Sequence, residues 1–178
     1  EKLPKVRGNY KIIHEDYTPV EKSKREDNTG VEFSHNNSVK ITVGDSKEGW
    51  VQSLDYFFSF INSSEYRNIN TIIINYNNVR PKGEVLKTFG GTASGHASMK
   101  NMFTKIDLVI KKRGAIEGKD RFKLKPIDCL DIANIIGENV VVGGVRRTAE
   151  IMLIDYDDTE CIEAKSKLYK QIDGQWIV

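Results

Sequence analysis

The chain has 178 residues, of which 39% are hydrophobic and 29% are charged, and its formal net charge is +2. This length and composition are those of one globular domain, and the charge is too small to indicate a nucleic-acid partner. Spanning a bilayer takes roughly 20 consecutive apolar residues, and no run in this sequence approaches that length, so no membrane partner is expected.

Residues 1–38 are polar and irregular in pattern, and they include a charged run at 21–30 that is typical of a solvated loop. The stretch SVKITV at 38–43 alternates apolar and polar residues and therefore predicts a half-buried strand. A helix is predicted over 47–65, because apolar residues recur there at three- and four-residue spacing. Ser46 is the expected N-cap of this helix.

The next predicted element is a strand at 69–76, INTIIINY, which is short and apolar enough to be buried on both faces. Two helices follow, one over 97–114 that stops at Gly114 and one over 126–137 that starts at Pro126 and stops at Gly137.

Residues 139–158 predict two strands around a glycine pair, and 159–172 predict a last helix. Strands and helices that alternate in this way favour an α/β fold with a mainly parallel sheet.

Unusual loops follow three of the predicted strands: GDS at 44–46, RPKGEVLKTFGGTASG at 80–95 and GGVRRTAE at 143–150. Ligands of open parallel sheets bind beyond the carboxyl ends of the strands. A phosphate group is bound by backbone N–H groups together with arginine or lysine, so these loops suit a nucleotide. The candidates are the glycines Gly83, Gly90, Gly91, Gly95, Gly143 and Gly144, the cations Arg80, Lys82, Lys87, Arg146 and Arg147, and the polar residues Asp45, Ser46, Thr88, Thr92 and Ser94.

Simpler interpretations of the same residues stand beside this one. Glycine-rich segments are mostly turns, and GGTASG lacks the lysine and hydroxyl residue of a P-loop because His96 and Ala97 stand in their places. Arg146 and Arg147 would point to opposite faces of a strand, so at most one of them would reach a shared ligand.

Cys129 and Cys161 are too few for a disulfide framework or a zinc site, and they indicate a cytoplasmic chain with reduced thiols. Neither has basic neighbours that would activate a thiolate, so both are interpreted as packing residues. The three histidines show no metal spacing. We therefore expect no catalytic and no metal-binding residue in this chain.

Three segments, VGDSKEGW, VRPKGEVLKTFGGTASG and IGENVVVGGVRRTAEIML, resemble in this order the adenosylcobalamin-dependent (class II) ribonucleoside-triphosphate reductases of the monomeric type. The resemblance runs from about Val39 to Asp158. It implies that residues 39–178 form part of a ten-stranded α/β barrel. It also implies an oxidoreductase that converts ribonucleoside triphosphates to deoxynucleotides for DNA replication through a thiyl radical generated with adenosylcobalamin.

The resemblance also implies an allosteric site in which a deoxynucleoside triphosphate (dNTP) selects the base to be reduced. The effector-binding residues implied by it are Asp45, Ser46, Arg80, Lys82, Gly83 and Lys87. The loops near the substrate would contain Gly90, Gly91, Thr92, Ser94, Gly143, Gly144, Arg146 and Arg147.

Departures from the family pattern show what this chain lacks. The radical cysteine of the family lies in an Asn-x-Cys-x-Glu motif, and Thr159–Glu163 has no asparagine, so that match is a coincidence. The chain is therefore interpreted as an internal fragment, inactive when isolated, whose partners are nucleotides and, if the gene is split, the remaining reductase segments. The alternatives are a stand-alone, non-catalytic deoxynucleotide-binding module and an unrelated phosphate-binding α/β domain.

Overall fold

The computed structural model describes residues 3–86, 91–140, 150–164, 170–172 and 175–177. A four-stranded sheet in the order β2-β5-β4-β3 lies at its centre. Strands β2, β5 and β4 are parallel to one another, whereas β3 runs antiparallel to β4, so the expectation of a mainly parallel sheet is confirmed. The strands are β2 (Lys11–His14), β3 (Gly30–Ser34), β4 (Ser38–Thr42) and β5 (Thr71–Asn75).

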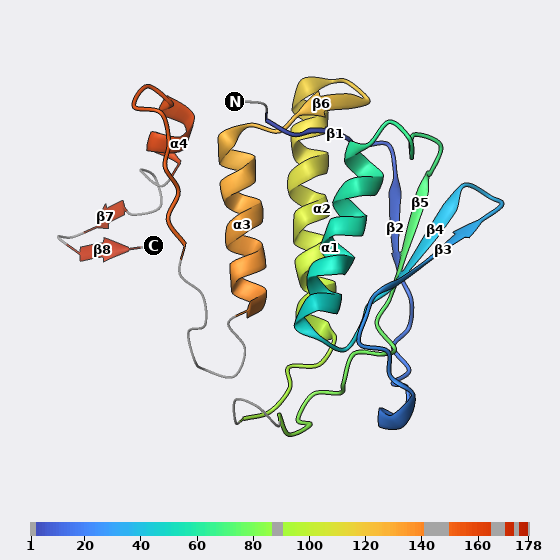
Figure 1. The fold of residues 1–178 in the computed structure, drawn as a ribbon. Helices are drawn as coiled ribbons and strands as arrows, with labels where there is room; N and C mark the ends of the chain where they lie inside the picture. The colour runs from blue at the N-terminus through green and yellow to red at the C-terminus, as the bar shows by residue number, and fades with distance from the viewer. Residues whose placement is uncertain (1–2, 87–90, 141–149, 165–169, 173–174, 178) are drawn as a thin grey trace.

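Three long helices stand beside the sheet: α1 (Lys47–Asn62), α2 (Ala97–Glu117) and α3 (Pro126–Val140). Figure 1 shows α1 and α2 against one face of the sheet and α3 on the far side of α2. Ile72 and Ile74 of β5 point into this layer, where Phe57 of α1 meets Phe103 of α2 edge to face at 5.6 Å. Burying these side chains is the main source of stability for the layer.

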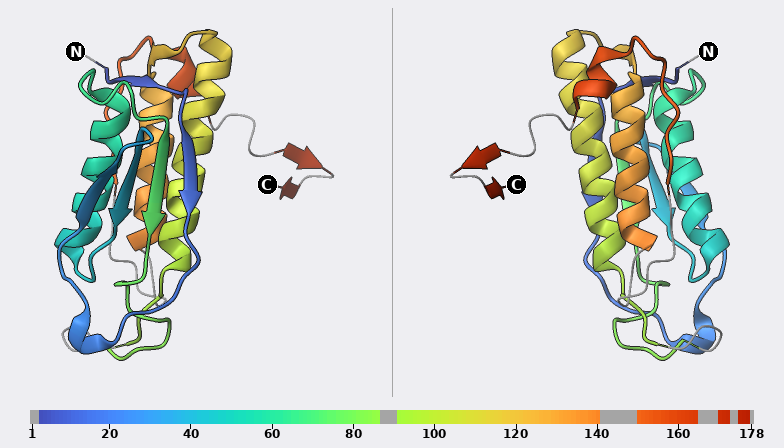
Figure 2. Two further views of the ribbon diagram at one scale, coloured as in Figure 1. Left: turned by 90° about the vertical axis from the view of Figure 1, so that its right-hand side faces the viewer. Right: turned by 90° about the vertical axis from the view of Figure 1, so that its left-hand side faces the viewer.

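Smaller elements close the end of the molecule at which α1 and α2 finish (Figure 2). Strand β1 (Lys5–Arg7) pairs antiparallel with β6 (Arg121–Lys123). The buried Arg7 guanidinium donates two hydrogen bonds to the carbonyl of Phe60, at 3.0 and 3.2 Å, and so ties β1 to α1. The remaining elements are the 3₁₀ turn η1 (Lys22–Lys24), the short helix α4 (Thr159–Glu163) and the hairpin strands β7 (Lys170–Ile172) and β8 (Gln175–Ile177).

The predicted strands at 38–43 and 69–76 and the three long helices are confirmed, but several details of the prediction are wrong. Residues 1–38 are not irregular, because they contribute β1, β2 and β3. Gly114 does not end α2; a Cβ there would lie 2.7 Å from Cε1 of Phe122, so the glycine lets β6 approach the helix. The helix ends instead at the left-handed Gly118, and Gly137 lies inside α3.

The C-terminal part departs further from the prediction. Residues 139–140 belong to α3, and 150–155 form no strand although they contain an apolar run at 151–154. The predicted helix over 159–172 is confirmed only for α4, and 170–172 are β7. The described strands form sheets of four, two and two strands, and their membership of a ten-stranded barrel stays a prediction. None of the described helices is long and apolar enough to cross a membrane.

Candidate functional site

The candidate site lies at the end of the sheet where the three parallel strands have their carboxyl ends. The segments that follow β2, β4 and β5 are held together there by backbone hydrogen bonds. These bonds run from the N–H of Glu15 to the carbonyl of Ile74 (3.0 Å), from Val43 to Asn75 (2.9 Å) and from Val20 to Asn77 (2.8 Å). Side chains from segments distant in sequence therefore meet at one edge of the sheet, as expected for a ligand site in such a fold.

Two of the predicted site residues, Asp45 and Arg80, bind each other directly. Oδ1 of Asp45 accepts hydrogen bonds from the backbone N–H of Arg80 at 3.0 Å and from its Nε at 2.9 Å. Nη2 of Arg80 donates to the carbonyl of Asp45 at 2.9 Å. The side-chain hydrogen bond that Arg80 donates to Asp45 is the largest cause of the raised pKa of Arg80. Asp45 is only 8% exposed, so it fixes the position of Arg80 rather than facing solvent.

Arg25 and Glu84 complete this charge cluster, and neither was among the predicted site residues. Nη1 of Arg25 lies 3.0 Å from Oε1 and 2.9 Å from Oε2 of Glu84, and 3.6 Å from Oδ2 of Asp45. Burial by itself raises the pKa of Glu84, but the hydrogen bond and charge of Arg25, with Lys22 and Arg80, outweigh it and lower that pKa. Two guanidinium groups and two carboxylates therefore neutralise each other at the strand ends.

The turn after β4 presents the amino end of α1 to the same region. Ser46 is the N-cap, as predicted: its Oγ accepts a hydrogen bond from the N–H of Gly49 at 2.9 Å and donates one to the carbonyl of Asp27 at 2.7 Å. Gly44 allows this turn to pack closely, since a Cβ there would lie 2.2 Å from the carbonyl oxygen of Asp27. The amino end of a helix favours negative charge, so it adds attraction for an anion beside the ion cluster.

The described parts of the glycine-rich loop, 80–86 and 91–95, lie antiparallel to each other as the two arms of a hairpin. The N–H of Gly83 donates to the carbonyl of Ala93 at 3.0 Å, and the N–H of Ala93 donates to the carbonyl of Glu84 at 2.8 Å. Gly83, Gly91 and Gly95 all have positive φ values, of 91°, 85° and 76°, which explains why glycine occupies these positions. Lys82, Gly83, Gly91 and Thr92 are exposed on this hairpin, whereas Ser94 is half-buried.

An aromatic pair stands beside the charge cluster. The rings of Tyr17 and His96 are stacked with their centroids 3.8 Å apart, and the Tyr17 hydroxyl donates to the carbonyl of Val79 at 2.7 Å. His96 is the N-cap residue of α2 but makes no side-chain capping bond. Burial, followed by the charge of Lys100, lowers the pKa of His96 and so favours the neutral ring.

The structure therefore brings together two of the three predicted loops. These are the loop at 44–46 and the loop at 80–95, whose exposed or half-buried members lie on the hairpin that carries Glu84. Seven predicted residues, namely Lys87, Thr88, Gly90, Gly143, Gly144, Arg146 and Arg147, lie outside the described residues, and their part in the site stays a prediction.

Sequence reasoning missed Arg25 and Tyr17, which carry no local signal of a site, and it gave Glu84 no role although Glu84 lies in the predicted loop at 80–95. Arg25 stands in a charged run whose other members are mostly solvated, and its partner Glu84 is 59 residues away. Only the strand order, which places the segment after β2 beside the one after β5, brings them together.

The two cysteines are not prepared as nucleophiles. Burial is the largest cause that raises the pKa of Cys161, to about 11, and it also raises the pKa of Cys129, so neither thiol is a ready thiolate. No cluster of histidine, cysteine and acidic residues suited to a metal ion occurs among the described residues. Fixed cations, a helix amino end and a hairpin with exposed glycines instead suit a polyphosphate.

Comparisons with known proteins connect the chain to one group of enzymes. Residues 13–110 match the family model described as the insertion domain of B12-dependent ribonucleotide reductase. The adenosylcobalamin-dependent ribonucleoside-triphosphate reductase of Lactobacillus acidophilus is 34% identical over 146 residues, which are 80% of this chain and 18% of the relative. The enzyme of the same name from Lactobacillus helveticus is 33% identical over 154 residues, or 82% of the chain and 20% of the relative.

A solved structure supports the same connection at the level of the fold. The crystal structure of a B12-dependent (class II) ribonucleotide reductase matches 89% of this chain and 21% of its own, with a TM-score of 0.63 and 22% identity. The chain thus spans about a fifth of the length of the relatives that it matches.

Proposed function

The chain belongs to the B12-dependent ribonucleotide reductases, and from this premise we propose that it forms the effector-binding region of a class II ribonucleoside-triphosphate reductase. In this proposal a deoxynucleoside triphosphate binds at the carboxyl ends of β4 and β5 and regulates the reduction of ribonucleoside triphosphates elsewhere in the cytoplasmic enzyme. Family membership also removes the alternative of an unrelated phosphate-binding domain.

The observation that carries the proposal is the cluster of Asp45, Arg80, Arg25 and Glu84. Arg80 is held by three hydrogen bonds to Asp45 and keeps 31% of its side chain exposed, so it is both oriented and accessible. An arginine positioned in this way can bind a phosphate through two parallel hydrogen bonds. Ser46 and the amino end of α1 lie next to Asp45 and add dipolar attraction for the same anion.

The hairpin at 80–95 supplies the second part of the proposed site. Lys82 and Gly83 are exposed where it leaves Arg80, so a phosphate on Arg80 would also meet a second cation and an accessible backbone. Thr92 and Ser94 stand on the returning arm of the hairpin. In the proposal this arm, together with the segment containing Gly143 and Arg146, transmits the identity of the base to the substrate.

Adenosylcobalamin, which the names of the relatives imply, does not fit the described residues. The groove between α1 and α3 has a volume of about 290 Å³ and is lined mainly by apolar side chains such as Phe58, Leu124 and Ile132. This volume is at the lower limit for a drug-sized ligand and is too small for a corrin. We therefore place the cofactor and the radical chemistry in other parts of the whole enzyme.

The segment 150–156 supports the view that this chain is completed by another part of the enzyme. Ile151 and Leu153 are 87% and 89% exposed, and Tyr156 is 94% exposed. Residues 151–154 are all apolar, and a short apolar run of this kind is typical of a strand that is buried among neighbours. In the proposal this segment becomes a barrel strand when the remainder of the reductase pairs with it.

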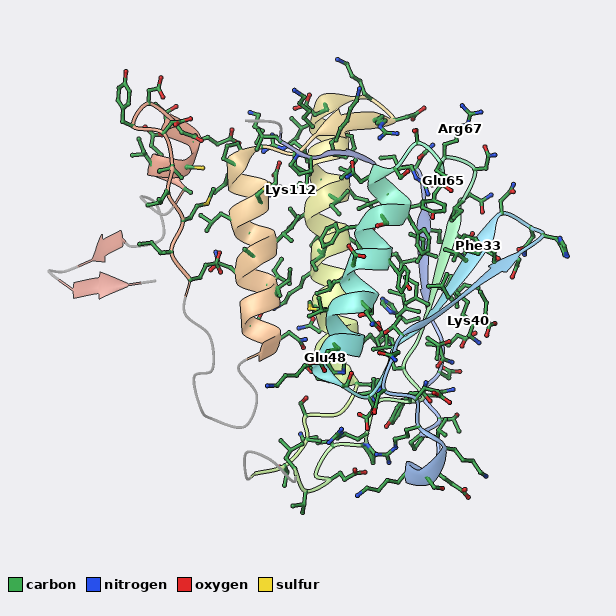
Figure 3. All side chains as sticks on the ribbon, in the orientation of Figure 1. Phe33, Lys40, Glu48, Glu65, Arg67 and Lys112 are labelled. Atoms are coloured by element: carbon green, nitrogen blue, oxygen red, sulfur yellow. The ribbon has the colours of Figure 1, made fainter. Side chains whose placement is uncertain are left out.

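Titration calorimetry of the chain with the four deoxynucleoside triphosphates tests the effector site. We expect at least one to bind, and Arg80→Gln to weaken that binding by tenfold or more, since a hydrogen bond to a charged group contributes about 1.5–3 kcal/mol. The matched control is Arg67→Gln, because Arg67 is exposed and lies near the opposite end of α1 (Figure 3). Equal binding by the Arg80→Gln and Arg67→Gln variants would contradict the assignment of the effector site, and so would the absence of binding by the wild-type chain.

A further inference from the structure

The salt bridge between Arg25 and Glu84 has the features of an internal substitute for a bound anion. The Arg25 side chain is only 8% exposed, and its Nε is fixed by the carbonyl of Val20 at 3.2 Å. Its Nη1 faces both oxygens of Glu84 at 3.0 and 2.9 Å. A guanidinium held in this way presents a site for a carboxylate or a phosphate oxygen, and in this structure a carboxylate of the same chain occupies it.

Of the two carboxylates on Arg25, Glu84 is the exchangeable one. Asp45 lies in the short turn before α1, and it also accepts two hydrogen bonds from Arg80 and lies 3.6 Å from Arg25. Glu84 stands on the hairpin, its side chain is 19% exposed, and its cationic partners are Arg25 and, at 3.8 Å, Lys22. Removing Glu84 from Arg25 therefore leaves the Asp45–Arg80 pair intact.

Moving Glu84 also moves the glycine-rich hairpin. The carbonyl of Glu84 accepts the hydrogen bond from Ala93, and the neighbouring Gly83 donates to the carbonyl of Ala93. Glu84 thus couples the segment before β3, which carries Arg25, to both arms of the hairpin. The positive φ values of Gly83 and Gly91 belong to backbone positions at which glycine can change conformation at little cost.

We propose that Glu84 is a built-in competitor of the nucleotide: a phosphate of the bound effector replaces the Glu84 carboxylate on Arg25 and thereby releases the hairpin. This inference rests on the proposed effector site. It makes Arg25 a phosphate-binding residue and Glu84 the element that distinguishes the empty state from the bound state. A ligand shifts an equilibrium between two states only through its different affinity for them. Here the two states differ in whether the Arg25 guanidinium is occupied by Glu84 or is accessible to a phosphate.

The competition has a measurable consequence for affinity. A protein that must first break an internal contact binds more weakly than one that is already open. Removing the charge of Glu84 should therefore strengthen binding, whereas removing a carboxylate that merely contacts the nucleotide would weaken it. The effect should be the same for any polyphosphate, because the replaced group is a phosphate and not a base.

The test compares Glu84→Gln with Glu21→Gln. Both remove one negative charge, but Glu21 pairs with Lys24 in an exposed ion pair, with 73% and 70% of the two side chains accessible. Calorimetry with inorganic tripolyphosphate and with the deoxynucleoside triphosphate that binds the wild-type chain should show Glu84→Gln binding each about fivefold more tightly or better, and Glu21→Gln binding them as the wild type does. Hydrogen exchange at the amides of Gly83 and Ala93 should be faster in Glu84→Gln without ligand, and faster in the wild type once ligand is bound.

A second variant separates competition from a structural role of the salt bridge. Arg25→Gln breaks the same contact, so it should speed exchange in the hairpin as Glu84→Gln does, but it should weaken binding instead of strengthening it. Equal affinities for Glu84→Gln and Glu21→Gln, or a change for the nucleotide without one for tripolyphosphate, would overturn the inference and leave the effector site standing. Failure of the wild type and of Glu84→Gln to bind any of the ligands would overturn the effector site and the inference together.

Discussion

Two arginine-centred ion clusters lie at opposite ends of the molecule and use similar chemistry in different surroundings. At the site end, Arg25 faces Asp45 and Glu84. At the other end, Arg113 of α2 donates to Asp128 of α3 at 2.7 and 3.1 Å and to Glu160 of α4 at 3.0 Å. Figure 1 shows α2 running from one end to the other, and Arg113 is about 24 Å along that helix from its first residue.

The two clusters differ in what their carboxylates are attached to. Asp128 is nearly buried, and its Oδ2 also accepts a hydrogen bond from the backbone N–H of Lys125, so it caps α3 while it binds Arg113. Both partners of that pair stand on long helices. Glu84 stands on a hairpin with three left-handed glycines and has no backbone hydrogen bond to its carboxylate among the described contacts. The Arg113 cluster is suited to holding helices together, and the Arg25 cluster is suited to exchange of its carboxylate.

The strongest test of this difference between the two clusters is to remove Arg113. We expect Arg113→Ala to lower the free energy of unfolding by about 3–5 kcal/mol, because it leaves the buried Asp128 carboxylate without its cation. Urea denaturation followed by circular dichroism measures the loss. The matched control is Lys105→Ala, which removes an ion pair between the same two helices, to Glu138, whose side chain is 62% exposed.

The control should cost less than about 1 kcal/mol, as exposed ion pairs usually do. Similar losses for Arg113→Ala and Lys105→Ala would mean that the buried cluster does not hold the helices together. The contrast between the two ends of the molecule would then fail.

A second prediction compares glycines near the two ends of α2. Gly95 and Gly118 both have positive φ, of 76° and 61°, but a Cβ on Gly95 would lie 2.9 Å from the backbone N of Lys82, whereas a Cβ on Gly118 would meet open space. Gly118→Ala should therefore cost only the left-handed conformation, about 1 kcal/mol. Gly95→Ala should cost about 2–3 kcal/mol, because strain and a backbone clash add up.

The same denaturation measurement decides between the outcomes. If the two alanine variants are destabilised equally, Gly95 on one arm of the hairpin does not pack against Lys82 on the other arm. The site end is then looser than the hydrogen bonds of the hairpin indicate. Gly118→Asn serves as a control, since asparagine tolerates the left-handed region better than alanine does.

The central layer was predictable because its signals are local. The apolar spacing of α1, α2 and α3 and the dense β-branched run of β5 identify these elements without knowledge of their partners. Strands β1 and β2 were missed because they have three and four residues and include Lys5, Arg7 and Lys11. Their strand conformation comes from pairing with β6 and β5, far away in the sequence.

Only part of the candidate site was predictable, namely the part whose signals are local in the sequence. Asp45, Arg80 and the glycines stand directly after strands, where the fold class itself indicates a site. Arg25 and Glu84 depend on how three loops meet, and no spacing along the chain contains that information. In the same way, the second of the two strands expected over 139–158 is not formed in the described residues 150–158, because a strand needs a neighbour as well as a suitable sequence, and no described segment pairs with it.

The smallest expected effect concerns the acid sensitivity of the Arg113 cluster. Hydrogen bonds from Lys125 and then from Arg113 lower the pKa of Glu160 in the folded chain. The unfolded chain therefore binds more protons than the folded chain as the pH falls below about 4.5, the ordinary value for this carboxyl. Consequently, the stabilisation by the Glu160 carboxylate is present at neutral pH and is lost as the pH falls through its folded pKa.

Glu160→Gln should remove this part of the pH dependence, so the difference in unfolding free energy from the wild type should shrink toward low pH. The difference should stay below about 1 kcal/mol even at pH 7, because the Glu160 side chain is 44% exposed and water screens its ion pairs. Glu65→Gln, at an exposed position after α1 (Figure 3), is the control and should follow the wild-type profile. A Glu160→Gln profile parallel to that of the wild type would show that α4 is attached by packing alone, and that the ion cluster at this end is confined to Arg113 and Asp128.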